Sequence, residues 1–309
     1  MKAVGFWQPG ESTSVIEDLS LPHPSMPKGR DLLIRVRAVA VNPRDLKSRR
    51  NISPSAGNPV VMGYDASGVV EATGPDVTLF RPGDHVFYAG VLDRQGANAE
   101  FQLVDERITG IKPAALSFEA AASVPLTGLT AWEMLFDRLQ LSVNGDADQT
   151  LLMLGGAGGV PCMAIQLART LSRVNIIGTA SRQESVRAVR GFGAHYVLDH
   201  SCALAPQVAS LAGLPPITRI FSTYTTPSAW ENMAEIIAPQ GRIGLIDDPE
   251  PLDLRLIKFK SVSVHWEAMF TRPMHVLRTC LNSMIFLTNS HACWIPVSSN
   301  LRCWQSMAG

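Results

Sequence analysis

Four glycines directly after a short apolar run are the residues of this chain whose spacing points most clearly to chemistry. Residues 149–161 read Q-T-L-L-M-L-G-G-A-G-G-V-P, and an apolar stripe at helical spacing begins at Val160. A strand, a glycine turn and a helix start place backbone N–H groups, with no side chain in the way, where a pyrophosphate can dock. An isolated glycine cluster is equally compatible with an ordinary tight turn, so its context decides. The predicted phosphate-binding residues are Gly155, Gly156, Gly158, Gly159 and Val160.

The segment after this helix indicates which dinucleotide would bind. Residues 175–179, N-I-I-G-T, predict a second buried strand, which ends at Ala180-Ser181-Arg182. In a dinucleotide fold that strand end meets the adenosine ribose, where an acidic residue would bind the 2′-hydroxyl of NAD. The hydroxyl of Ser181 and the guanidinium of Arg182 suit a 2′-phosphate instead. The sequence therefore favours NADPH, with a surface turn as the alternative role of Arg182.

Composition and charge fit one intracellular enzyme and exclude several other classes. The 309 residues can hold two domains, and 46% of them are hydrophobic and 17% charged. The 27 basic and 27 acidic side chains cancel, so nothing indicates a nucleic-acid surface. No secretory signal or membrane-length apolar run is visible, and the five cysteines include no C-x-x-C pair. These observations predict a cytoplasmic protein.

The pattern of predicted elements changes once, near residue 120. Before it, short alternating segments separated by turns predict a small barrel-like β domain. Residues 120–136 then predict a helix with Pro125 near its start. From residue 149 onward strands alternate with helices, which implies a parallel, doubly wound sheet.

Several further motifs occur in a recognisable order. G-Y-D-A-S-G-V-V at residues 63–70, R-P-G-D-H-V at residues 81–86 and the glycine loop together resemble the medium-chain dehydrogenase/reductase superfamily. Within it, four motifs resemble the quinone oxidoreductase-like branch, and more narrowly the group labelled zinc-type alcohol dehydrogenase-like. They are V-N-P-R-D at residues 41–45, P-L-T-G-L-T-A-W at 125–132, T-A-S-R at 179–182 and H-W-E-A-M-F-T-R at 265–272.

The resemblance, which runs from residue 1 to about residue 272, implies a two-domain α/β fold. A β-rich GroES-like catalytic domain would cover residues 1–122, completed in part by residues 266–309. A Rossmann NADP-binding domain would cover residues 123–265. The implied activity is hydride transfer from NADPH to a small quinone or enone, with no nucleic-acid or membrane partner and with a homodimer left open.

The label of the group calls for a test of zinc binding. In the zinc alcohol dehydrogenases a cysteine, the histidine of G-H-E and a further cysteine hold the catalytic metal. Here Asn42 and Tyr64 stand at the first two positions, and residues 123–125 offer no third ligand. Residues 88–105 also lack the four cysteines of the structural zinc lobe. Because zinc needs three or four thiolate, imidazole or carboxylate ligands, the sequence predicts no metal site.

The absence of these ligands changes the expected substrate. Without a Lewis acid a saturated alcohol is a poor substrate, because nothing polarises its oxygen. Hydride delivery to a quinone or an α,β-unsaturated carbonyl is easier, since the electrons run through a conjugated system to oxygen. By resemblance, Asn42 and Tyr64 are the catalytic candidates that would hydrogen-bond the developing enolate or quinol oxygen. Two local roles stay open: Asn42 as a turn residue before Pro43, and Tyr64 as a wall residue.

Two further residues complete the predicted cofactor site. Thr127 lies in the helix start that, by resemblance, approaches the nicotinamide. His200 follows a predicted strand at residues 196–198, on the side where the family often holds the 2′-phosphate. A plain loop role is equally compatible with its position.

Two departures from the family pattern affect these expectations. Pro161 follows the glycine loop where the family has glycine; in the first helical turn it should leave the fold intact, but it puts cofactor affinity in doubt. After Glu267 the sequence has no Asp, Glu or Lys, and the closing helix and strand of the family are not visible. We expect a poorly ordered or unusually packed tail, cleaved after Arg278 or Arg302, and an aggregation-prone or weakly active protein.

Three alternative functions remain. A true zinc alcohol dehydrogenase is opposed by the missing ligands. A catalytically impaired nucleotide-binding protein would follow from Pro161 and the altered tail. A Rossmann methyltransferase leaves no place for the β-rich N-terminal part.

Overall fold

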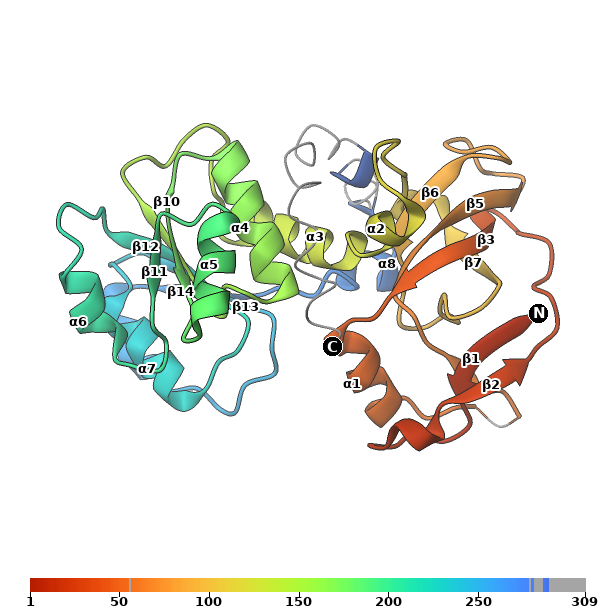
Figure 1. Cartoon of the computed structure of the whole chain (residues 1–309), viewed down its shortest axis with the longest axis horizontal. Coiled ribbons are helices and arrows are strands. Elements are labelled where there is room, and N and C mark those ends of the chain that lie inside the picture. Colours follow the sequence, from red (N-terminus) through yellow and green to blue (C-terminus); the bar gives the residue numbers. More distant parts are fainter. Residues whose placement is uncertain (56, 278, 281–285, 289–309) are drawn as a thin grey trace. The chain divides into compact units, whose positions relative to one another are not determined.

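The computed structural model describes residues 1–55, 57–277, 279–280 and 286–288 (Figure 1). These residues divide into two compact units. Unit 1 contains Met1–Leu129 and the described residues from Met269 onward, and unit 2 is Thr130–Ala268. None of the helices in the described ranges combines the length and the apolar character that a membrane crossing requires.

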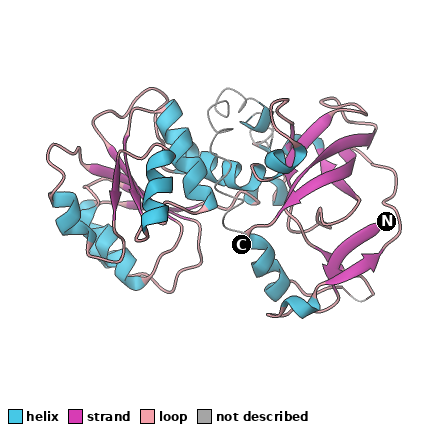
Figure 2. Ribbon diagram, viewed as in Figure 1, coloured by secondary structure: helices cyan, strands magenta, loops and turns pink. Residues whose placement is uncertain are grey.

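Unit 1 is built mainly from two antiparallel sheets (Figure 2). Inward-facing side chains of the larger sheet form an apolar core that includes Leu32, Ile34, Val70 and Val86. The smaller sheet has the order β2-β1-β4, with β1 (Lys2–Phe6), β2 (Glu17–Ser20) and β4 (Val60–Val61). The larger sheet has the order β7-β3-β5-β6-β8, with β3 (Asp31–Ala40), β5 (Asp65–Thr73), β6 (His85–Ala89), β7 (Phe101–Asp105) and β8 (Thr109–Ile111).

The register between β3 and β5 determines where the candidate catalytic residues lie. Ala40, the last residue of β3, is paired with Asp65, the first residue of β5. The chain leaves β3 and enters α1 (Pro43–Asn51), with Asn42 as the N-cap and proline at the first helical position, where it loses no needed N–H. Asn42 therefore starts close to Asp65. The remaining short helical elements here are Thr13–Val15, Glu106–Ile108 and α2 (Phe118–Ala122).

The single helix predicted over residues 120–136 is wrong in one respect. The structure has α2, then a break, then α3 (Pro125–Trp132), followed by a π-helical segment, Glu133–Arg138. Proline has no backbone N–H, and its ring disfavours the helical conformation at the preceding residue. Pro125 therefore ends one helix and starts another.

Unit 2 is a parallel six-stranded sheet of order β11-β10-β9-β12-β13-β14. Strand order reverses beside β9, which is where doubly wound sheets bind ligands at their carboxyl edge. The strands are β9 (Thr150–Met153), β10 (Asn175–Thr179), β11 (Tyr196–Leu198), β12 (Ile217–Ser222), β13 (Arg242–Leu245) and β14 (Ser263–Trp266). This sheet and the β-rich unit 1 confirm the predicted fold class.

Helices cover both faces of this sheet, α4 and α5 on one side and α6 and α7 on the other (Figure 1). The apolar stripe that begins at Val160 becomes α4, whose inward face buries Ala164, Ile165, Leu167 and Ala168. The helices are α4 (Gly159–Leu171), α5 (Gln183–Gly191), α6 (Leu204–Ala209) and α7 (Pro227–Ile236), with a 3-10 segment at Leu254–Lys260.

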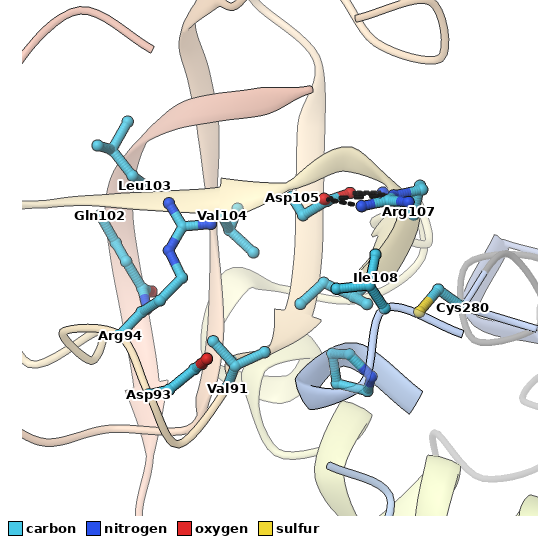
Figure 3. Close-up of a pocket in the computed structure, with 13 residues that line it drawn as sticks. Val91, Asp93, Arg94, Gln102, Leu103, Val104, Asp105, Arg107, Ile108 and Cys280 are labelled. Atoms are coloured by element: carbon cyan, nitrogen blue, oxygen red, sulfur yellow. Dashed lines mark hydrogen bonds and ion pairs between the residues drawn. The ribbon is translucent and has the colours of Figure 1, made fainter. Parts of the chain in front are cut away.

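The described residues after Met269 pack within unit 1, starting with α8 (Thr271–Met274). Cys280 is buried in the apolar core of unit 1 and lies near Ile108 (Figure 3). Leu287 is fully buried against Gly110, where an added Cβ would lie 2.4 Å from the Leu287 Cβ. At these positions the side chains fill the core of unit 1, and the expectation of a poorly ordered or unusually packed tail stays a prediction. The rest of the tail prediction, including cleavage after Arg278 or Arg302, lies outside the described residues.

Candidate active site

The glycine turn after β9 has no room for side chains. Gly155 has φ +74°, and an added Cβ there would lie 2.6 Å from the Thr223 Oγ1. At Gly156 an added Cβ would lie 3.1 Å from the carbonyl oxygen and 3.2 Å from the nitrogen of Thr179. Backbone atoms cannot yield as a flexible side chain can. The turn therefore requires glycine at these two positions.

The turn uses some of its N–H groups and leaves others available. Gly155 N–H donates to the Thr179 Oγ1 (3.0 Å), Gly156 N–H to the Thr179 carbonyl (3.0 Å) and Gly158 N–H to the Gly155 carbonyl (3.0 Å). The N–H groups of Gly159 and Val160, in the first turn of α4, have no partner among the described residues. A helix N-terminus with unpartnered N–H groups suits an anion. This turn therefore fits the pyrophosphate of a dinucleotide.

Pro161 is the third residue of α4, and the helix continues through it to Leu171. The Cys162 N–H still reaches the Gly158 carbonyl (2.9 Å). The fold is intact, as expected from proline in a first turn. The proline nevertheless removes one N–H from the group that would face a phosphate.

Three predicted cofactor residues lie at the carboxyl edge of the sheet of unit 2. Ser181 and Arg182 follow β10, and His200 follows β11, which is paired in parallel with β10. Arg182 is the N-cap of α5; its side chain makes no capping bond, is exposed, and has no ion-pair partner in the described part of the chain. The guanidinium is thus available to an external anion.

The buried hydroxyl of Thr179 connects the glycine turn to His200. Its Oγ1 accepts the Gly155 N–H and lies 3.2 Å from the His200 Nδ1. When the Thr179 proton is donated to Nδ1, a neutral His200 carries its own proton on Nε2, the nitrogen away from Thr179. The ring then offers an N–H donor at the same edge as Arg182. Thr179 is not among the site residues predicted from the sequence, although it lies at the end of the predicted strand, two residues before Ser181.

The two catalytic candidates belong to a buried network in unit 1 formed by Asn42, Asp45, Ser48, Tyr64 and Asp65, named here the α1–β5 network. Its members come from the N-cap and the first two turns of α1, from the residue before β5 and from the first residue of β5. The Asn42 Nδ2 donates to the Asp65 Oδ2 (2.8 Å), and the Leu126 N–H donates to the Asp65 Oδ1 (2.7 Å). Complete burial of Asp65 raises the pKa of its carboxyl to about 8.

The second carboxylate of the network, Asp45, holds the backbone rather than side chains. Its Oδ2 accepts the Asn42 N–H (2.7 Å), and its Oδ1 accepts the Gly63 N–H (3.2 Å). Burial raises the pKa of Asp45, and these two N–H bonds partly oppose that change. Asp45 thereby fixes the start of α1 and the turn before Tyr64.

Tyr64 is buried with its hydroxyl directed at α1. The phenol donates to the Ser48 Oγ (2.8 Å), and the ring meets Phe270 edge-on, with centroids 5.6 Å apart. Burial raises the pKa of Tyr64, while the bond to Ser48 and the nearby Arg44 lower it. Since its only proton goes to Ser48, Tyr64 would have to exchange that bond before donating to a ligand. Ser48 itself carried no signal in the sequence.

Thr127, the remaining predicted cofactor residue, uses its hydroxyl within its own helix start. The Oγ1 donates toward the carbonyls of Ser123 (3.3 Å) and Val124 (3.2 Å), and the side chain is buried. The structure thus brings Asn42 and Tyr64 into one network in unit 1. Among the described residues, the Thr127 hydroxyl forms no hydrogen bond with that network.

These residues do not fit a catalytic zinc. The Asn42 amide and the Tyr64 phenol act as donors in their hydrogen bonds, and both oxygens of Asp65 accept N–H groups. Within the described residues no three His, Cys, Asp or Glu side chains are grouped so that they could hold a metal ion. An amide and a phenol of raised pKa are poor substitutes for thiolate and imidazole. Zinc independence stays a prediction, and it rests on the chemistry of these donor groups.

Unit 1 also contains a cavity of about 190 Å³ that includes none of the predicted site residues (Figure 3). Both arginines that line it are already paired, Arg107 with Asp105 (2.7 Å) and Arg94 with Asp31 (2.9 Å). The Cys280 thiol donates to the Arg272 carbonyl (3.0 Å). The cavity therefore adds nothing to the site.

Comparison with known proteins agrees with this geometry. Residues 28–127 match the alcohol dehydrogenase GroES-like domain, and residues 159–281 match the zinc-binding dehydrogenase family. A zinc-type alcohol dehydrogenase-like protein of Staphylococcus aureus (strain COL) is 41% identical over 280 residues, which cover 89% of this chain and 82% of the relative. A quinone oxidoreductase of Pseudomonas aeruginosa is 34% identical over 220 residues, which cover 71% of this chain and 65% of the relative.

Solved structures give the same result. A candidate zinc-dependent alcohol dehydrogenase from Rhizobium etli CFN 42 has 49% identity and a TM-score of 0.89, covering 94% of this chain and 85% of that one. A mycobacterial protein complexed with NADPH has 29% identity and a TM-score of 0.75, covering 87% and 82%. These matches extend over both units. The chain belongs to the medium-chain dehydrogenase/reductase superfamily, in its quinone oxidoreductase-like branch.

Proposed function

We propose that this protein is an NADPH-dependent, zinc-independent reductase of quinones or α,β-unsaturated carbonyls. The observation that carries the proposal is the donor set of the α1–β5 network. An amide and a phenol occupy the positions at which the zinc alcohol dehydrogenases have ligands, and both are held by buried hydrogen bonds. A conjugated acceptor needs hydrogen-bond donors at its oxygen and no Lewis acid.

The cofactor part of the proposal rests on unit 2. The N–H groups of Gly159 and Val160 would bind the pyrophosphate, and Ser181, Arg182 and the His200 ring would bind the adenosine ribose phosphate. The absence of an acidic side chain at positions 181 and 182 favours NADPH over NADH. The mycobacterial relative solved with NADPH supports this assignment.

The chemical step assigns distinct tasks to the cofactor and to the protein. When bound, NADPH would supply the hydride that reduces the conjugated acceptor, and negative charge would develop on the acceptor's oxygen. Asn42 would donate an N–H to that oxygen as negative charge develops, and the Tyr64 hydroxyl would assist after exchanging its bond to Ser48. A proton from solvent then completes the enol or quinol. The products are the reduced acceptor and NADP⁺.

The experiment compares acceptor classes with the purified protein and measures its metal content. We expect NADPH oxidation with a benzoquinone or a cyclic enone, no NADP⁺ reduction with a primary alcohol, and no loss of turnover on chelation. Well under one zinc per chain is expected in elemental analysis. Stoichiometric zinc with chelator-sensitive alcohol oxidation would instead establish the zinc-type dehydrogenase named among the relatives. NADPH binding without turnover of any acceptor would establish an impaired nucleotide-binding protein.

A further inference from the structure

We propose that Asp65 is a positioning residue that decides which edge of the Asn42 amide faces the substrate oxygen. The inference rests on the proposed function, because it assigns Asn42 to that oxygen. It goes further by locating the control of this contact in a buried carboxyl group that touches neither substrate nor cofactor.

Asp65 joins three segments of unit 1 through its two oxygens. It lies at the start of β5, its Oδ2 accepts from Asn42 at the cap of α1, and its Oδ1 accepts from Leu126 at the start of α3. The Leu126 group is a backbone N–H, which can only donate. The Oδ1 must therefore remain an acceptor, and only the Oδ2 can carry a proton.

The Asn42 side chain faces the Asp45 N–H as in a capping box but makes no side-chain capping hydrogen bond, so its amide can reverse without losing such a bond. Capping is done by other groups: the Asn42 N–H donates to the Asp45 Oδ2 (2.7 Å), and the Asp45 N–H donates to the Asn42 backbone carbonyl (2.9 Å). Within the described residues, the side-chain hydrogen bond of Asn42 is the one to Asp65. The orientation of the amide is thus determined by what Asp65 offers to it.

An amide has one accepting edge and one donating edge, so the two protonation states of Asp65 select opposite orientations. With Asp65 ionised, the Asn42 Nδ2 faces Asp65 and the Asn42 Oδ1 is turned away, as observed. With the Asp65 Oδ2 protonated, the amide must reverse, so that its oxygen accepts the new proton and its NH₂ group is turned away. The second orientation is the one that presents two N–H donors to an oxygen gaining negative charge.

The electrostatic surroundings place this change within an accessible pH range. Asp65 is completely buried, and the charged group that acts on it is Asp45 of α1. The neutral groups that act on it are the Asn42 amide at the cap of α1 and the Leu126 N–H of α3. Burial is the largest cause of the raised pKa of about 8, and the Asp45 charge adds to it. The rate of reduction should therefore fall as the pH rises past about 8.

The variant Asp65→Asn tests this directly. The new amide must give its oxygen to the Leu126 N–H, so its NH₂ group meets Asn42 and locks the Asn42 amide with its own NH₂ turned away. We expect the alkaline fall in kcat to disappear, so that at pH 9 the variant exceeds the unmodified enzyme by about tenfold, with KM little changed. A uniform loss of kcat at every pH, with the alkaline fall retained, would overturn the proposal.

A swapped pair separates positioning from simple structural support. In Asn42→Asp combined with Asp65→Asn, the buried hydrogen bond is kept but a carboxylate now faces the substrate oxygen. The protein should fold with near-normal stability, while kcat falls by about a hundredfold because a charge of the wrong sign meets the developing oxyanion. Recovery of full activity in the swapped pair would show that Asp65 is only a structural support.

Two readouts do not depend on turnover and therefore separate failure of this inference from failure of the proposed function. The side-chain NH₂ resonances of Asn42, in protein labelled with ¹⁵N-asparagine, should shift with an apparent pKa near 8 and be pH-independent in Asp65→Asn. The free energy of unfolding should also fall between about pH 4 and pH 8. In this range the folded state holds the Asp65 proton and the unfolded state does not.

In Asp65→Asn this decrease in stability should be lost, whereas the exposed control Asp18→Asn on β2 should keep it. A flat Asn42 titration in the unmodified protein would contradict the inference, even if quinone reduction is observed. Conversely, the Asn42 NH₂ resonances could still shift with pH in a protein that reduces no acceptor. That result would support the control of Asn42 by Asp65 and reject the proposed function.

Discussion

The two candidate regions of this molecule hold their polar groups in opposite ways. At the carboxyl edge of unit 2, the N–H groups of Gly159 and Val160 have no partner among the described residues, and Arg182 is exposed. In the α1–β5 network of unit 1, the polar side chains of Asn42 and Tyr64 are buried and already bonded. The first region is ready to accept a ligand as it stands. The second must exchange or reorient a bond before it can act on one.

The largest effect is expected from Gly155→Ala, which changes the backbone of the glycine turn at the carboxyl edge of unit 2. The position has φ +74°, and the added Cβ would lie 2.6 Å from the Thr223 Oγ1. We expect NADPH affinity, measured by fluorescence titration, to fall by about a hundredfold. The control Gly191→Ala at the end of α5, where an added Cβ meets nothing within 4 Å, should bind normally. Equal binding by both variants would show that the turn is not the phosphate site.

A smaller effect is expected from Arg182→Ala, which removes a side chain from the same edge. NADPH should bind about tenfold more weakly while NADH affinity stays the same, because only the 2′-phosphate contact is lost. The exposed control Arg187→Ala, further along α5, should leave both affinities unchanged. Equal affinity of the unmodified protein for the two cofactors would remove the basis of this prediction.

A matched pair of tyrosines tests the role of the α1–β5 network. Tyr64 and Tyr88 are both buried in unit 1, and each hydroxyl makes one hydrogen bond of 2.8 Å, to Ser48 and to Gln102. Replacement by phenylalanine should cost each variant about 1 kcal/mol of stability in denaturant unfolding. Only Tyr64→Phe should also lower kcat, by about fivefold. If the two variants lose the same activity, Tyr64 is a wall residue.

The smallest effect is expected from two histidines at opposite ends of β11. His200 follows the strand and would contact the ribose phosphate, whereas His195 precedes it and accepts the Ile176 N–H (2.9 Å). His200→Ala should weaken NADPH binding by about threefold. His195→Ala should lower stability and leave NADPH affinity unchanged. The reverse pattern would place the adenosine at the wrong edge of the sheet.

The elements that the sequence predicts well are those determined by local pattern. The strand predicted at residues 175–179 is β10, and the apolar stripe from Val160 becomes the inward face of α4. Hydrophobic periodicity and glycine turns involve only a few neighbouring residues, so the sequence alone predicts the elements that depend on them. The same reasoning mistakes residues 120–136 for one helix, because the break at Pro125 depends on a single ring.

Only one of the two candidate regions can be predicted from local sequence patterns. The glycines themselves indicate a turn with available backbone N–H donors. No local pattern predicts the hydrogen bonds that position Asn42, since Asp65 lies 23 residues away from it and Leu126 lies 61 residues beyond Asp65. In the sequence Asp65 appears only as one residue of the G-Y-D-A-S-G-V-V motif. Its contact with Asn42 follows from the β3–β5 register, which depends on pairing between distant segments.

The packing of Leu287 against Gly110 has a consequence for the order in which the chain is made. The Thr288 Oγ1 accepts the Ile111 N–H across 177 residues, so unit 1 is assembled from chain on both sides of unit 2. On the ribosome, unit 2 emerges as one uninterrupted stretch and can fold as soon as it is released. The surface of β8 stays uncovered until residues 287 and 288 have been synthesised. During this interval the nascent chain contains a folded unit 2 and an incomplete unit 1. We expect the need for chaperone protection to be greatest then.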